Sequence, residues 1–213
     1  EQYQVWDYIN KDVGFVTGSI TLTLRQEKNK KYYYVEIKEN SYFTNILKIN
    51  ADDFTTILER RLDGHTKKLI EEVSYSSKGK AYFTNSEKGI KKIYEDTDLN
   101  YYSRFAYMIS FRGFPFGKKN EVYFKTYMNE YPAGPLTMKL KNLGIETVRV
   151  KAGKYRCYKL ELSVDGWQGN FSRDKYYLYY AVQKPHIFVK FLQKVDTGEW
   201  LANELISYRS SLK

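Results

Sequence analysis

The sequence predicts a mostly β protein, in which one large curved antiparallel sheet, a half-barrel or β-roll, wraps around one central α-helix. Three observations lead to this prediction. Short segments of alternating polarity, separated by turn residues, recur along the chain. Tyrosine, which favours strands, is unusually frequent at 22 residues. One segment alone, Asp98–Phe111, has its apolar residues at helical spacing.

The length and composition predict a single β-rich domain over residues 1–213. With 42% hydrophobic residues, 28% charged residues and four prolines, the chain is typical of globular proteins. No run of about 18 apolar residues occurs, so no transmembrane segment is expected. The sequence begins with Glu1 rather than Met, as it would after removal of an export signal or after any other shortening of the chain.

The first half of the chain is expected to form a β-meander. In its first strand Ile20, Leu22 and Leu24 alternate with Thr21 and Thr23, which places the two sets on opposite faces. The predicted strands are Phe15–Arg25, Lys31–Glu39, Tyr42–Ile49, Phe54–Leu62, Lys67–Tyr75, Lys80–Thr84 and Gly89–Tyr94.

The segment Asp98–Phe111 predicts the helix. Asp98 is a suitable N-cap residue, and Gly113 and Pro115 end the helical pattern. The apolar positions leave only a narrow polar stripe, so such a helix must be buried on most sides. We therefore expect the sheet to wrap around it.

Further strands follow the helix. A tight turn is expected at Gly153, since glycine adopts the positive φ that hairpin turns require. The predicted strands are Glu121–Met128, Leu136–Leu143, Thr147–Lys151, Tyr155–Val164, Tyr176–Val182, Ile187–Lys194 and Trp200–Tyr208.

The strand Tyr176–Val182 carries tyrosines on both faces, which alternation divides between a concave side and a convex side. We expect the concave side to pack against the helix and the convex side to meet solvent. Pro185 follows the strand and cannot donate to a central ladder, so Lys184–His186 is predicted to be a hairpin turn at the rim of the sheet.

Three segments together resemble the domain-of-unknown-function family 3108, a set of mostly exported bacterial envelope proteins. They are Asp98–Val122, the hairpin Glu146–Leu162 with its V-x-V-x-A-G-x-Y-x-C pattern, and Asp174–Phe191. Lys151 stands where that family often has a proline. The resemblance implies a half-barrel around a helix, similar to bacterial lipoprotein carriers, and a location in the periplasm or cell envelope. It implies no activity, and fold analogy is a weak guide to function.

No residue pattern predicts catalysis, so we expect no enzyme activity, no metal and no cofactor. The chain has two histidines, His65 and His186, both expected in exposed loops, and no HExxH, nucleophile elbow or Walker loop. Cys157 is the only cysteine, which excludes an internal disulfide. A structural, half-buried Cys157 is favoured over a nucleophile, which would need a lowered pKa.

The leading functional hypothesis is a non-enzymatic protein that binds a lipid or another amphiphile between sheet and helix. The candidate wall residues lie on the predicted helix and are Tyr102, Phe105, Met108 and Ile109. The alternative is an envelope interaction protein that recognises a polysaccharide or a protein through exposed tryptophans, for which Trp6, Trp167 and Trp200 are candidates. Nucleic-acid binding is disfavoured, because no RNP-like signature accompanies the basic composition.

The charge excess lies almost entirely in one segment. Of the net charge of +10, Arg112–Lys159 carries +8, with 11 basic and 3 acidic residues. A solvated face explains such a cluster, and so does a contact with an anionic envelope surface. The candidate contact residues are Lys139, Lys141, Arg149 and Lys151.

Overall fold

The computed structural model describes residues 2–10, 16–39, 42–76, 79–95, 101–126, 135–166, 175–194 and 200–211. Within these ranges the protein is mostly β, with a 14-stranded antiparallel sheet and one short α-helix. The prediction of a mostly β, antiparallel protein is therefore confirmed.

The elements agree closely with the sequence periodicity in the first half of the chain. The strands there are β1 (Gln2–Asn10), β2 (Val16–Glu27), β3 (Lys30–Glu39), β4 (Phe43–Asn50), β5 (Thr56–Asp63), β6 (Leu69–Tyr75), β7 (Lys80–Asn85) and β8 (Ile90–Glu95). The remaining elements are α1 (Tyr107–Ser110), the 3₁₀ turn η1 (Phe111–Gly113), β9 (Glu121–Thr126), β10 (Leu136–Val150), β11 (Gly153–Val164), β12 (Lys175–Ala181), β13 (Phe188–Lys194) and β14 (Trp200–Ser210).

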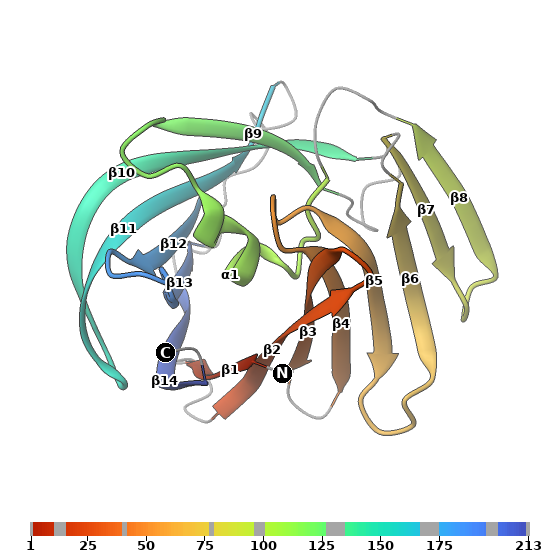
Figure 1. The fold of residues 1–213 in the computed structure, drawn as a ribbon, viewed down its shortest axis with the longest axis horizontal. Coiled ribbons are helices and arrows are strands. Elements are labelled where there is room, and N and C mark those ends of the chain that lie inside the picture. Colours follow the sequence, from red (N-terminus) through yellow and green to blue (C-terminus); the bar gives the residue numbers. More distant parts are fainter. Residues whose placement is uncertain are drawn as a thin grey trace.

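The chain begins and ends in the middle of the sheet. Strand order is β8-β7-β6-β5-β4-β3-β2-β1-β14-β13-β12-β11-β10-β9, so β1 pairs with β2 on one side and with β14 on the other. Strands β8 and β9 are thus the two edges, and the chain between them must pass from one edge to the other. That connection carries α1, and Figure 1 shows α1 between the arc of β9–β13 and strands β2–β5.

The helix is much shorter than predicted. Within the described residues 101–113, only Tyr107–Ser110 is α-helical, and the 3₁₀ turn η1 follows it, so the prediction of a helix over Asp98–Phe111 is wrong in its extent. Asp98, its predicted N-cap, lies outside the described residues.

Tertiary hydrogen bonds explain why the segment before α1 is not helical. Tyr101 forms a parallel bridge with Lys125 of β9, and the Tyr102 N–H donates to the Lys125 carbonyl at 2.9 Å. On the other side, the Thr56 N–H donates to the Tyr101 carbonyl at 3.3 Å, and the Ser103 N–H donates to Thr56 Oγ1 at 2.8 Å. The backbone groups that a helix would pair internally are paired with β9 and β5 instead.

The core lies between α1–η1 and one face of the sheet. Ile20 and Leu22 of β2 are 2% and 3% exposed, as their alternation with threonine predicts. They belong to one cluster with Leu160 of β11, Leu178 of β12 and Ile109 of α1. Full burial of a leucine side chain is worth about 1.5–3 kcal/mol, so this cluster fixes the position of α1.

Strand β10 is continuous where two strands were predicted. Its register with β11 shifts between Asn142 and Ile145, and this bulge exchanges the two faces of β10. Before the bulge, the face of β10 that carries the buried Leu140 packs against α1–η1. After the bulge, the opposite face of β10 is the buried one, and its residues Val148 and Val150 are 7% and 6% exposed. The Ala152 N–H donates to the Leu205 carbonyl of β14 at 3.0 Å, which fixes the end of the hairpin.

The tyrosines of β12 are buried on both faces. The Tyr180 hydroxyl donates to the Tyr107 carbonyl of α1, as expected for the concave side. On the opposite face Tyr179 is only 3% exposed, beside Cys157 and Lys159 of β11. The expectation that this face meets solvent is wrong at Tyr179. After the bulge in β10, the β10–β11 hairpin buries side chains on the same side of the sheet as Tyr179.

Candidate functional site

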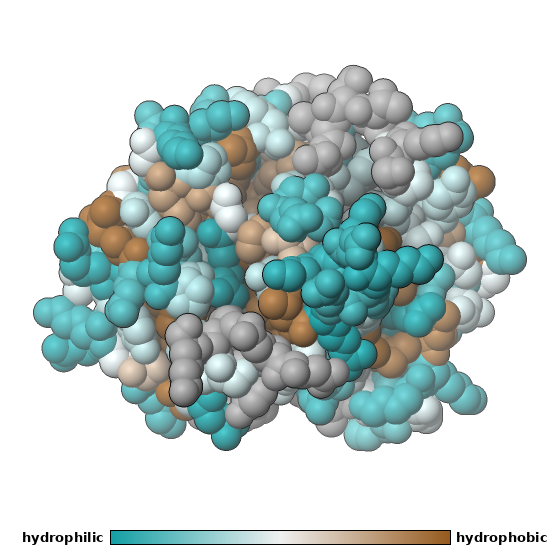
Figure 2. Space-filling view, viewed as in Figure 1, coloured by the Kyte–Doolittle hydropathy of each residue, from teal (hydrophilic) through white to brown (hydrophobic). Residues whose placement is uncertain are grey.

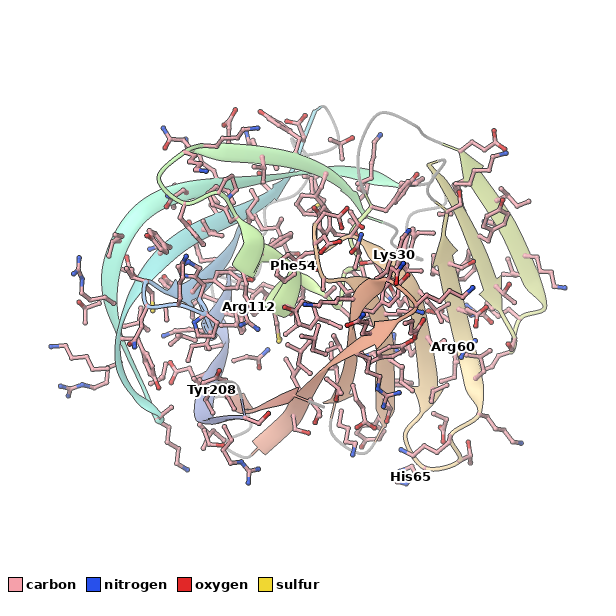
Figure 3. The ribbon with its side chains drawn as sticks, viewed as in Figure 1. Lys30, Phe54, Arg60, His65, Arg112 and Tyr208 are labelled. Carbon is pink, nitrogen blue, oxygen red and sulfur yellow. The ribbon has the colours of Figure 1, made fainter. Side chains whose placement is uncertain are left out.

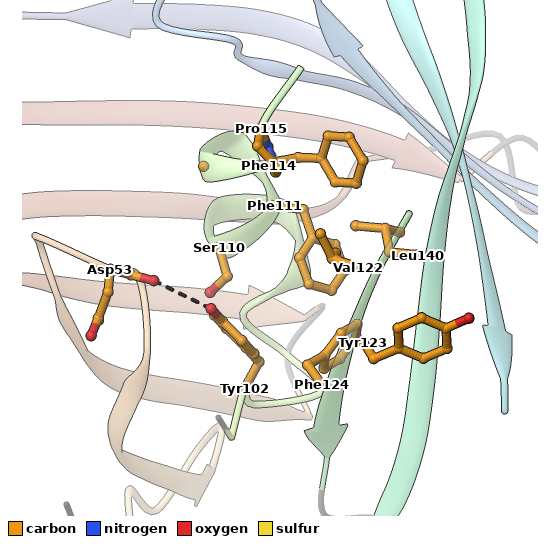
Figure 4. Close-up of a pocket in the computed structure, with 11 residues that line it drawn as sticks. Asp53, Tyr102, Ser110, Phe111, Phe114, Pro115, Val122, Tyr123, Phe124 and Leu140 are labelled. Atoms are coloured by element: carbon orange, nitrogen blue, oxygen red, sulfur yellow. Dashed lines mark hydrogen bonds between the residues drawn. The ribbon is translucent and has the colours of Figure 1, made fainter. Parts of the chain in front are cut away.

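A pocket of about 120 Å³ lies between the α1–η1 segment and strands β9 and β10 (Figure 4). Tyr102, and Asp53 from the turn before β5, complete its wall. The residues that line it are Asp53, Tyr102, Ser110, Phe111, Gly113, Phe114, Pro115, Val122, Tyr123, Phe124 and Leu140.

Three aromatic rings form one wall of the pocket. The ring centroids of Phe111 and Phe124 are 5.0 Å apart, and those of Tyr102 and Phe124 are 5.4 Å apart in an edge-to-face arrangement. These are the geometries that aromatic pairs prefer. The wall is therefore apolar and held in place by its own packing.

Polar groups gather at the opposite side, near the turn that precedes β5. The Tyr102 hydroxyl donates to the Asp53 carbonyl at 3.3 Å, the bond drawn in Figure 4, and the Ser110 hydroxyl donates to the Phe54 carbonyl at 3.3 Å. Figure 3 shows Phe54 and Arg112 lying beside α1. The pocket thus combines an apolar wall with a small polar side, as ligand sites commonly do.

The volume limits what the pocket can hold. An apolar cavity of about 150 Å³ accommodates benzene, whereas drug-sized ligands occupy about 300–1,000 Å³. A pocket of about 120 Å³ has room for one ring or for the end of an alkyl chain, and not for a whole acyl chain.

The structure separates the four predicted wall residues. Tyr102 lines the pocket, and Ile109 is 1% exposed within the core. Met108 is half-buried against that core, and Phe105 lies 4.7 Å from the Arg104 guanidinium. The sequence prediction missed the other two aromatic wall residues, Phe111 and Phe124. The phenylalanines around Gly117 are the one signal in the sequence that could have indicated them.

The four predicted surface cations fall into two environments. On β10 before the bulge, Lys141 lies opposite Glu121 of β9 and Glu161 of β11. Lys139 lies opposite Tyr123 of β9 and Ser163 of β11. Beyond the bulge, Arg149 lies directly opposite Lys154, and Lys151 occupies the turn. Arg149 and Lys151 are both exposed.

Cys157 and the histidines show no catalytic arrangement. Burial, together with the negative charge of Glu146, raises the pKa of the fully buried Cys157 thiol to about 12, so it stays protonated. His65 is exposed at the end of the β5–β6 hairpin (Figure 3), as predicted. His186 is half-buried, contrary to expectation, because its ring packs 5.1 Å from Phe116 and its Nδ1 lies 2.9 Å from the Ala181 carbonyl.

Two further features bear on the functional alternatives. Among the described residues, no group of three or more His, Cys, Asp or Glu side chains could hold a metal ion, and no helix is long and apolar enough to cross a membrane. Trp167 lies outside the described residues, as do the side chains of Trp6 and Trp200.

No protein-family model and no curated protein matches the sequence. The resemblance to family 3108 therefore gains no support from these comparisons. Among solved structures, the chain is similar to a β-barrel-like protein of the domain-of-unknown-function family DUF1849 from Brucella abortus. The TM-score is 0.55 at 8% identity, over 100% of this chain and 98% of that chain.

Two other solved structures are less similar. One is a protein described as exported, with a YmcC-like fold, from Bacteroides fragilis, with a TM-score of 0.38 and 13% identity over 98% of this chain and 95% of that chain. The other is a protein described as a lipoprotein from Parabacteroides distasonis, with a TM-score of 0.35 and 12% identity over 97% of this chain and 94% of that chain. The fold of this chain is thus similar to that of a β-barrel-like protein from a family of unknown function.

Proposed function

We propose that the protein is a non-enzymatic envelope protein that binds the apolar end of an amphiphilic ligand in the pocket between α1–η1 and strands β9 and β10. The half-barrel arrangement and the exported location are part of this proposal, and they rest on the resemblance of Asp98–Phe191 to family 3108. The ligand occupies the space between helix and sheet that the topology creates.

The observation that supports this proposal best is the division of the pocket into two sides. The rings of Tyr102, Phe111 and Phe124 offer an apolar wall, and the Ser110 hydroxyl and Asp53 carbonyl offer polar groups on the other side. An alkyl chain end contacts the rings, while a hydroxyl at the mouth reaches the polar side. Such a pocket favours an uncharged or weakly polar amphiphile, since Asp53 is the one charged residue among the described residues that line it.

Binding of 1-octanol, followed by isothermal titration and ligand-observed NMR, tests the proposal. Val122→Phe places a ring in the pocket and should abolish binding. Thr137→Phe adds the same ring to β10 at a position that alternates away from the pocket, and should leave binding unchanged. Failure of the native protein to bind, or equal binding by Val122→Phe, would overturn the proposal.

A second function is supported by the free end of the β10–β11 hairpin, residues 147–156, which we call the basic hairpin end. It carries Arg149, Lys151, Lys154 and Arg156 and no acidic residue. The register places Arg149, Lys154 and Arg156 on one face, and none of the four cations forms an ion pair within the described part of the chain. Like charges placed directly opposite one another disfavour folding unless a partner screens them.

Exposed apolar residues adjoin this charge. Leu143 and Ile145 are 44% and 49% exposed, and Ile145 shares the face of Arg149. Figure 2 shows hydrophobic and hydrophilic residues side by side along the left-hand rim, where Figure 1 draws β10 and β11. Cations beside exposed aliphatic side chains suit an anionic lipid surface.

Cosedimentation with anionic and neutral vesicles at low and high salt tests this contact. Each basic residue near an anionic surface contributes about 1 kcal/mol, so Arg149→Gln with Lys154→Gln should weaken binding about 30-fold. Lys139→Gln with Lys141→Gln makes the same change in net charge. We expect a smaller loss there, because Lys141 lies between two carboxylates. Equal binding to both vesicle types would refute the contact.

A further inference from the structure

A row of polar side chains crosses four neighbouring strands on the core-facing side of the sheet. Asn45 of β4 lies opposite Arg61 of β5, which lies opposite Glu71 of β6, which lies opposite Asn85 of β7. Because side chains alternate along a strand, this polar row shares its face with the fully buried Leu47. Polar residues are rare on such a face unless they have partners or a ligand.

Two members of the polar row have hydrogen-bonding groups that nothing in the described residues satisfies. Asn45 is 0% exposed, and neither its amide Nδ2 nor its Oδ1 has a hydrogen-bond partner. The Nε of Arg61 is also buried and also has none. By contrast, Asn85 Nδ2 donates to Glu71 Oε1 at 3.1 Å. The unsatisfied groups are therefore concentrated at the Asn45–Arg61 pair.

Aromatic rings hold the Arg61 side chain in place. Its guanidinium carbon lies 3.8 Å from the centroid of the Phe43 ring and 5.6 Å from that of Phe105. A guanidinium stacked on an aromatic face is a recurrent element of anion recognition, because the ring fixes its plane while its N–H groups stay free to donate. Arg61 is thus positioned before any ligand arrives.

The neighbouring charges favour an anion. Glu59 lies one row away, and burial raises its pKa to about 7, so at neutral pH a large share of it is uncharged. Arg104 lies close enough to act on Glu59 electrostatically, as do Arg61 and Glu71. With two arginines against Glu71 and a partly neutral Glu59, the local balance is positive.

We propose that Asn45 and Arg61 form a binding site for a small carboxylate that carries a hydrogen-bond donor on its α-carbon, such as an α-hydroxy acid. The carboxylate accepts hydrogen bonds from Arg61 Nε and Asn45 Nδ2, and the α-hydroxyl donates to Asn45 Oδ1. This set of contacts satisfies all three unpaired groups at once.

This site is separate from the pocket proposed above and does not depend on it. The Tyr101–Ser103 segment lies between them, since Tyr102 lines the pocket whereas Ser103 hydrogen-bonds to Glu59. Binding at one site can therefore be removed without filling the other.

Isothermal titration with sodium lactate tests the site, with propionate as the analogue that lacks the donor and lactamide as the one that lacks the negative charge. We expect lactate to bind at least about tenfold more tightly than either analogue, because a buried acceptor left unpaired disfavours binding. Asn45→Leu removes both amide atoms with little change in volume and should abolish lactate binding. Arg61→Met keeps an apolar contact with Phe43 and should also abolish lactate binding. This variant tests the site if Asn45→Leu does not fold.

Val122→Phe should bind lactate as the native protein does, which separates this test from that of the pocket. Three results would overturn the proposal. They are no lactate binding by the native protein, equal affinity for propionate, and a crystal structure grown with lactate in which only water bridges Asn45 and Arg61.

Discussion

Replacing Glu59 by glutamine should remove a large part of the pH dependence of stability. The carboxyl group of Glu59 is on β5 and is 7% exposed. Burial raises its pKa from an ordinary 4.5 to about 7, opposed in part by a hydrogen bond from Ser103 and by the positive charge of Arg104. Glutamine keeps the shape of the side chain and cannot ionise.

The magnitude follows from the difference in pKa between the folded and unfolded chain. In the unfolded chain Glu59 loses its proton near pH 4.5, whereas in the folded protein it keeps the proton until about pH 7. The stabilisation from this group is thus complete below pH 4.5 and declines as the pH rises to 7. Each pKa unit corresponds to about 1.4 kcal/mol, which gives a decline of about 3 kcal/mol in the free energy of unfolding.

Urea unfolding between pH 4.5 and pH 8, followed by tryptophan fluorescence, measures this decline. We expect the native protein and Glu59→Gln to have similar stabilities at pH 4.5, and the variant to be more stable by about 3 kcal/mol at pH 8. Glu87→Gln, in the exposed turn between β7 and β8, controls for the loss of one negative charge. If the native protein and Glu59→Gln lose stability in parallel as the pH rises, the reasoning about Glu59 is refuted.

Two further predictions concern packing. Cys157 is fully buried and its thiol has a raised pKa, so the folded protein should not react with a thiol reagent at pH 8. The urea-unfolded chain should react fully, and rapid labelling of the folded protein would contradict the burial of Cys157. A Cβ at Gly113 would lie 2.9 Å from Phe54 Cδ2, a contact that overpacks the turn after α1. Gly113→Ala should therefore lower the free energy of unfolding by about 1–2 kcal/mol, and Phe54→Leu in the same chain should recover part of that loss. An unchanged urea midpoint for Gly113→Ala would disprove the contact.

The sequence by itself determined most of the strands, because local alternation encodes them. Ile20 and Leu22 are buried where their spacing places them, and the turn at Gly153 has the positive φ of 137° that the sequence predicts. Pairing between adjacent strands is likewise a local matter, since short turns leave few other partners. Pro185 correctly marked the turn between β12 and β13.

The candidate sites were less visible in the sequence. Tyr102 could be named from its place on an apolar segment, but the pocket also needs Leu140 and Phe124, which come from strands whose approach to α1 is a tertiary property. The Asn45–Arg61 pair gave no signal, because an asparagine and an arginine in alternating strands are indistinguishable from solvent-facing residues. Only the register between β4 and β5 places them side by side within the core.

The tertiary structure alone decided the length of the helix, the centre of the sheet and the buried face of the hairpin. Tyr101 and Tyr102 have helical spacing, yet β9 and β5 supply hydrogen bonds that outweigh the local preference. Strand β1 was not predicted as a strand, and it joins the two halves of the sheet by pairing with β2 and β14. The bulge after Asn142 turns the basic residues outward and buries Val148. Each of these outcomes depends on contacts between residues far apart in the chain, which no local period can encode.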